Sequence, residues 1–147
     1  MTPPTIAQLL PVLQIAIGPV ILISGIGLLL LSMTNRYART IDRARELSYA
    51  RHHPDGEKDR DRIEQQIEIL WRRSQILRRA IFFGTLSVLW AAILIITLFI
   101  TELLQVEAGW LLGLIFIACL ASLIVSLIDS IRDVNVSLVA VRLEIER

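Results

Sequence analysis

Three long uncharged stretches dominate the pattern of apolar and polar positions along this chain. They run over residues of about 9–33, 80–101 and 108–128. Each one reaches the roughly 20 residues that an α-helix needs to cross about 30 Å of hydrocarbon. Lipid offers no hydrogen-bond partner to a free backbone group, so each stretch must be helical. The pattern predicts an all-α membrane protein with three transmembrane helices.

The polar stretches that follow the spans also carry a helical pattern. Apolar residues recur at steps of three and four through 35–79, on either side of a turn at residues 52–56. The tail repeats these steps at Ile131, Val134, Leu138, Val141 and Ile145. Heptads of this kind are typical of packed helices. We therefore expect a helical hairpin over 35–79, with Trp71 packed on its seam, and a C-terminal helix over 129–147. Both would continue the spans as one cytoplasmic bundle within a single membrane domain, 1–147.

Charge adds an orientation to this picture. The mean hydropathy is +0.63 and the net charge only +1, yet twelve of the fifteen Lys and Arg lie within 36–79. The connection 102–107 carries two carboxylates and no base. The positive-inside rule then predicts an N-terminus outside and a C-terminus in the cytoplasm, in a multi-pass protein of the cell (plasma) membrane. Basic and acidic residues alternate in 36–79, which argues against a nucleic-acid partner.

The first span differs from the other two in its helix-disturbing and polar residues. Besides Pro11, it contains Gln14, Gly18, Pro19, Ser24 and Gly25. Proline removes a helical hydrogen bond, glycine permits close approach, and a buried amide needs a partner or water. One interpretation is that this helix lines a pore or an interface between protomers. The alternative is packing inside one protomer, with Gln14 bonded to a neighbour such as Thr97.

Two carboxylates mark the outer connection. In a symmetric oligomer Glu102 and Glu107 would form a ring, and such rings attract inorganic cations to a channel mouth. The alternative is a short loop that is polar because it is solvated.

The inner boundary carries a second polar group. Asp129 is costly at this depth unless it is paired. Arg36, Arg78 and Arg79 are candidate ion-pair partners and Asn35 a candidate contact, while an ion or proton site is the alternative.

Arginines close to the membrane are candidates for binding anionic lipid headgroups. They are Arg36, Arg39, Arg78 and Arg79. The alternative is that they serve as a topology signal on a solvated face.

Catalytic chemistry has no clear carrier in the sequence. There is no paired nucleophile and base, and His52 and His53 lack the spaced ligands of a metal site. Cys119 lies in an apolar run and is expected to be a small buried packing residue. We expect no enzyme activity, no metal and no cofactor.

Several stretches carry a resemblance. They are LQIAIGPVILISGIGLLLLSMTNR at 13–36, IDRAR at 41–45, and then Gln65, Ile67, Leu70, Arg72, Arg73, Leu77 and Arg78. The chain resembles a prokaryotic membrane family catalogued as domain of unknown function 2721. That resemblance implies a small bacterial-type membrane protein and supplies no site residues.

Two functions remain open from these observations. The first is a homo-oligomeric, cation-conducting pore, since three spans cannot readily enclose a path and symmetric copies would be needed. The second is a non-conducting scaffold whose coiled-coil heptads bind a partner while the spans anchor it. A transporter would more often show internal repeats, and none is visible.

Overall fold

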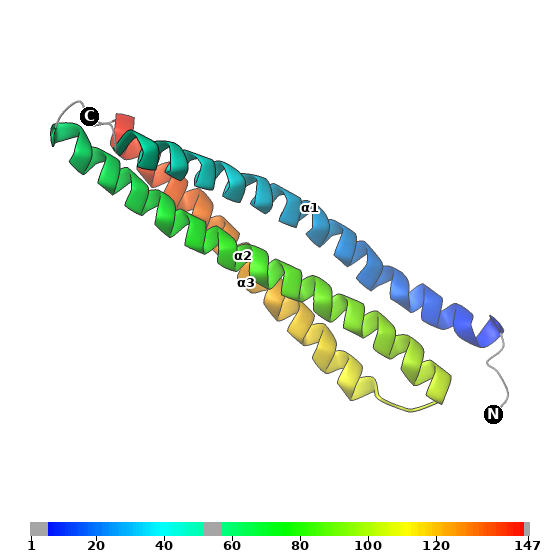
Figure 1. Cartoon of the computed structure of the whole chain (residues 1–147). Helices are drawn as coiled ribbons and strands as arrows, with labels where there is room; N and C mark the ends of the chain where they lie inside the picture. Colours follow the sequence, from blue (N-terminus) through cyan, green and yellow to red (C-terminus); the bar gives the residue numbers. More distant parts are fainter. Residues whose placement is uncertain (1–5, 52–56, 146–147) are drawn as a thin grey trace. The chain divides into compact units, whose positions relative to one another are not determined.

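The protein consists of three long helices joined by two short connections (Figure 1). They are α1 (Ile6–Arg51), α2 (Glu57–Leu104) and α3 (Gly109–Ile145). The computed structural model describes residues 6–51 and 57–145, and the side chains of 10, 11, 13–49 and 63–136. The described chain contains no strand. Each predicted span thus belongs to a helix that continues beyond it, and the turn at 52–56 lies outside the described residues.

All three helices are long and apolar enough to cross a membrane. The qualifying stretches are Leu13–Tyr49, Ile63–Leu104 and Gly109–Val136. α1 runs unbroken through both Pro11 and Pro19. The all-α fold with three candidate membrane helices is therefore confirmed, while the side of the membrane on which each end lies stays a prediction.

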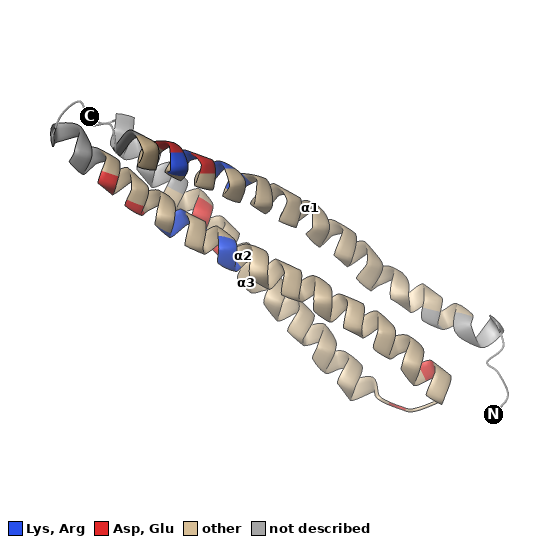
Figure 2. Ribbon diagram, viewed as in Figure 1, with Lys and Arg blue, Asp and Glu red and all other residues tan. Residues whose placement is uncertain are grey.

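The chain divides into two compact units. The first unit comprises Met1–Leu30 with Phe83–Val125, and the second comprises Leu31–Phe82 with Ser126–Arg147. All fifteen Lys and Arg belong to the second unit, and the only charges of the first are Glu102 and Glu107. In Figure 2 the coloured Lys and Arg all lie in the second unit, whereas Asp and Glu occur both there and near the α2–α3 connection.

Small residues hold α2 against α3 in the first unit. The hydroxyl of Ser87 donates to the backbone oxygen of Cys119 at 2.9 Å, and the thiol of Cys119 donates back to the backbone oxygen of Ser87 at 3.3 Å. Both side chains are fully buried, as is Ala91. Small residues let membrane helices approach closely enough for such bonds. The expectation that Cys119 is a buried packing residue is confirmed.

A serine of α3 joins all three helices in the second unit. The hydroxyl of Ser126 donates to the backbone oxygen of Ala80 on α2 at 2.7 Å. Its oxygen also lies 4.0 Å from the sulfur of Met33 on α1. All three residues are buried. The helical segments of this unit therefore pack around a small polar contact.

The end of α2 fixes the short α2–α3 connection. Gln105 adopts a left-handed conformation with φ of 50°. Its N–H donates to the oxygen of Glu102, and the N–H of Val106 donates to the oxygen of Thr101. This pair of bonds is the Schellman motif that often ends helices, usually with glycine at the left-handed position. α3 then begins four residues later, after residues 106–108, which have no regular secondary structure.

Two expectations about packing are wrong. On α3 the buried residues of the second unit are Ser126, Asp129 and Asp133, whereas Ile131 and Val134 of the expected apolar seam are exposed. The tail side chains from 137 onward lie outside the described residues. Trp71, expected to pack on the seam, is 64% exposed. The carboxylates of α3 take the inward face because arginines of α2 lie opposite them and form ion pairs with them.

Candidate functional site

The outward face of α1 in the first unit carries most of the polar and small residues that singled out this span. Gln14, Gly18 and Gly25 are all exposed, and their spacing of four and seven places them on one stripe of the helix. A Cβ added at either glycine would meet nothing within 4 Å. The amide of Gln14 makes no hydrogen bond within the described chain, and Thr97 bonds instead to Ile93. The predicted Gln14–Thr97 contact is absent.

The other two candidates of this span behave differently. Pro19 is half-buried, in register with the buried Ala16 and Ile26 of the same helix. The hydroxyl of Ser24 is exposed but donates to the backbone oxygen of Val20 at 3.2 Å, within its own helix. The open stripe of α1 is therefore formed by Gln14, Gly18 and Gly25, and we call it the α1 stripe.

The two carboxylates of the α2–α3 connection are held differently. Glu102 is half-buried in the last turn of α2, and its Oε1 accepts a hydrogen bond from Nε2 of Gln105 at 3.2 Å. Glu107 is exposed and precedes the N-terminus of α3, where the helix dipole favours a negative charge. Both groups keep accepting capacity toward solvent.

Asp129 lies between two arginines in the second unit. Its Oδ2 is 3.1 Å from Nε of Arg79, and its Oδ1 is 3.6 Å from Arg132. The carboxylate is nearly buried, but both arginine side chains are more than half exposed. Oδ2 faces Arg79 without hydrogen-bond geometry. The ion pair with Arg79 suggested by the sequence is present. Asn35 is exposed and uses its backbone oxygen to accept from Arg39.

A second carboxylate, not singled out by the sequence, forms a more enclosed pair. Oδ1 of Asp133 accepts a hydrogen bond from Nε of Arg73 at 3.2 Å, with side chains 1% and 21% exposed. Asp133 follows Asp129 by four residues and so shares its helix face. The spacing of four between Asp129 and Asp133 could have indicated a buried polar face. The regularly spaced apolar residues on the opposite side of the tail favoured the other face instead.

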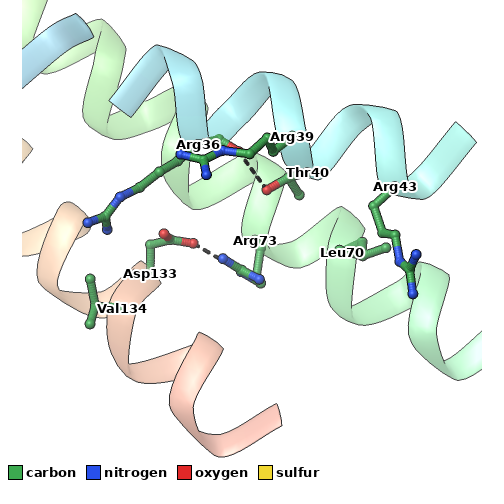
Figure 3. A pocket seen from close by; sticks show the side chains of 8 residues that line it. All are labelled: Arg36, Arg39, Thr40, Arg43, Leu70, Arg73, Asp133 and Val134. Atoms are coloured by element: carbon green, nitrogen blue, oxygen red, sulfur yellow. Dashed lines mark hydrogen bonds and ion pairs between the residues drawn. The ribbon is translucent and has the colours of Figure 1, made fainter. Parts of the chain in front are cut away.

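The Arg73–Asp133 pair forms part of an open groove of about 610 Å³. We call it the arginine groove. It is lined by Arg36, Arg39, Thr40 and Arg43 of α1, Leu70 and Arg73 of α2, and Asp133 and Val134 of α3. Figure 3 shows Arg36, Arg39 and Arg43 along α1, together with the Arg73–Asp133 pair that joins α2 to α3. Of the four arginines proposed for lipid, Arg36 and Arg39 line this groove, whereas Arg78 and Arg79 do not.

Metal chemistry finds no support in the described side chains. No three His, Cys, Asp or Glu among them lie close enough to hold an ion. His52 and His53 lie outside the part of the chain that the structure describes.

Comparison with known proteins identifies a family. A family model described as a protein of unknown function (DUF2721) matches residues 16–143. No curated protein and no solved structure matches the chain. The matched range contains Gly18, Gly25, Arg73 and Asp133, while Gln14 lies just before it. Because the match covers most of the chain, the protein belongs to the DUF2721 family of proteins of unknown function.

Proposed function

We propose that the protein is a homo-oligomeric membrane pore, selective for cations, in which the α1 stripe faces the shared axis. The observation that carries this proposal is the open state of that stripe. Gln14, Gly18 and Gly25 share one exposed face of the uncharged part of α1.

The amide of Gln14 supports a contact with something other than lipid. Transfer of an unpaired amide into hydrocarbon costs several kcal/mol, of the order of 4–8 on water-to-cyclohexane scales. The described residues of the same chain offer this amide no partner. Water in a path, or the same group on a second copy, would remove that cost.

The two glycines support close approach of such a copy. Small residues at membrane helix interfaces allow backbones to pack tightly. Nothing within the protomer lies near the missing Cβ of Gly18 or Gly25, so the space is open to another chain. Closed symmetry would place identical stripes around one axis.

Cation selectivity rests on the outer connection. Glu102 and Glu107 are the only charges of the first unit, and both are negative. Repeated by symmetry, they would raise the local concentration of cations at that mouth. The arginines of the second unit have the opposite sign, so the proposal assigns selectivity to the carboxylates alone.

Planar-bilayer recordings of the purified protein test this proposal. We expect current in the wild type, and a shift of the reversal potential toward anions in a Glu102→Gln, Glu107→Gln variant. Gly25→Leu should abolish both the oligomer and the current, because a large side chain would separate the helices. Gly27→Leu is the matched control. Gly27 is also exposed, and a Cβ added there would meet nothing within 4 Å, but it lies about 200° around the helix axis from Gly25.

The results that would reject the pore are specific. Absence of current at all voltages and ions from a protein shown to be oligomeric would reject conduction. Equal effects of the two glycine substitutions would reject the α1 stripe as the shared face.

A second candidate function is an anchored, non-conducting interaction protein. It is favoured by two aromatic side chains of the second unit, Trp71 and Tyr49, which are both largely exposed. Exposed aromatic residues are frequent anchors of protein interfaces. A photo-crosslinking amino acid at position 71 should capture one partner protein in cells. Capture of lipid or of the same chain alone would count against this function.

A further inference from the structure

The arginine groove has a surplus of positive charge. Four guanidinium groups and one carboxylate line it, and the carboxylate of Asp133 is already matched by Arg73. The other three guanidinium groups, those of Arg36, Arg39 and Arg43, lie on one face of α1, and among the described residues only Arg43 pairs with a carboxylate, the exposed Glu46. Like charges at spacings of three and four along a helix repel one another. Such an arrangement is costly unless an anion offsets it.

The hydrogen-bond donors of these arginines are mostly uncommitted. The guanidinium of Arg36 makes no hydrogen bond or ion pair with the described part of the chain, while its backbone oxygen accepts from the hydroxyl of Thr40 at 2.9 Å. Arg39 uses only Nε, toward the backbone oxygen of Asn35 at 3.3 Å. Arg43 pairs with Glu46 at 3.4 Å, but both side chains are about two-thirds exposed, so this contact is weak. Each guanidinium carries five N–H donors, most of which remain available here.

The wall opposite α1 is fixed by the buried pair. Arg73 is held by Asp133 and is thereby prevented from swinging into solvent. Leu70 and Val134 complete the lining with apolar surface. The groove thus combines three arginines of α1 with a wall on which Arg73 is paired and Leu70 and Val134 supply apolar surface (Figure 3).

Phosphoryl oxygens are the ligands that best match this chemistry. The planar fork of arginine binds two oxygens of a phosphate at once, and such charge-assisted bonds are about twice as strong as neutral ones. We propose that the arginine groove is a binding site for a phosphoryl group, held by Arg36 and Arg39 with Arg43 at its edge. A lipid headgroup and a soluble phosphate share this chemistry. The proposal is independent of whether the protein conducts ions.

Two probes separate the sources of the phosphoryl group. The full-length protein is reconstituted in vesicles of phosphatidylcholine with and without phosphatidylglycerol, and lipid retention is measured by native mass spectrometry. In parallel, inorganic phosphate and pyrophosphate are titrated onto the detergent-solubilised protein. Binding of phosphatidylglycerol alone identifies a lipid site, and binding of the soluble anions identifies a soluble ligand; either result supports the proposal. Binding of neither probe by the wild type overturns it.

Matched variants test the groove itself. Arg36→Gln with Arg39→Gln removes two charges from the groove, while Arg45→Gln with Arg72→Gln removes two exposed charges from the same unit outside it. Loss of the first pair should weaken binding about tenfold or more, because several charge-assisted bonds disappear. The second pair should bind like the wild type. Equal losses in both variants would show nonspecific attraction and overturn the proposal.

A lysine variant separates geometry from charge. Arg36→Lys with Arg39→Lys keeps both charges but loses the forked donors. We expect binding between that of the wild type and that of the glutamine variant. Full retention of binding by the lysine variant would overturn recognition by the guanidinium forks.

Discussion

Arg73 and Asp133, sixty residues apart in the chain, form the most enclosed ion pair of the described structure, at 3.2 Å between Nε and Oδ1. The bond ties α2 to α3 within the second unit. Asp133 is an almost fully buried carboxylate whose burial depends on that guanidinium. Removal of one partner from such a pair leaves an uncompensated charge, which is more damaging than removal of both.

Arg73→Gln should therefore destabilise the protein by about 3 kcal/mol, because it strands the buried carboxylate. Asp133→Asn should cost somewhat less, since Arg73 keeps some access to solvent. The double variant should recover part of the loss. Unfolding in mixed micelles, followed by circular dichroism, measures each value. Losses that simply add would show that the two side chains act independently.

Asp129 is expected to respond differently from Asp133. Its partners Arg79 and Arg132 are 60% and 64% exposed, so solvent screens both contacts. Its Oδ2 also lacks a hydrogen bond, which makes the charged form costly to bury. Asp129→Asn should thus change stability by less than about 1 kcal/mol. The same unfolding measurement checks this, and a loss as large as that of Arg73→Gln would mean that Asp129 is held by more than its two ion pairs.

Ser126 provides a prediction about polar contacts between helices. Ser126→Ala removes its bond to the backbone oxygen of Ala80 and should cost about 0.6 kcal/mol, the average for hydrogen bonds between membrane helices, and no more than about 1.7 kcal/mol. Ser24→Ala is the control, because the Ser24 hydroxyl bonds only within its own helix. We expect little change in the control. Equal effects would indicate that loss of any serine hydroxyl matters, rather than this contact between helices.

The three helices were predictable because the length of an uncharged, apolar stretch is enough to predict a membrane-spanning helix. A stretch of roughly 20 uncharged residues can satisfy its backbone in lipid only as a helix. The spacing of apolar residues also predicted that each helix continues beyond its span, and α1, α2 and α3 all do so. The residue types also identified α1 as the span with exposed polar and small residues. Only Gln14, Gly18 and Gly25 form the α1 stripe, however, and Pro19 packs inward.

The tail of α3 was not predictable from apolar residues. Its buried positions in the second unit are Ser126, Asp129 and Asp133, at steps of three and four, while the apolar Ile131 is exposed. Ranking by hydrophobicity places the apolar face inward. Carboxylates take the inward face here because arginines of α2 lie opposite, and burial of a charge becomes tolerable once it is paired. The pairing partners are distant in sequence, so their spacing could not reveal them.

Membrane orientation can be tested through the single native cysteine. Cys119 is fully buried, so a membrane-impermeant maleimide should not label the folded wild type. A cysteine at Val106 in the α2–α3 connection, or at Tyr49 near the end of α1, would be exposed. The charge partition places Val106 outside and Tyr49 in the cytoplasm, because basic segments are retained on the cytoplasmic side. In intact cells Val106→Cys should therefore be labelled at once, and Tyr49→Cys only after permeabilisation. The reverse pattern would overturn the orientation, and with it the assignment of Glu102 and Glu107 to an outer mouth. The wild type serves as the control in both conditions.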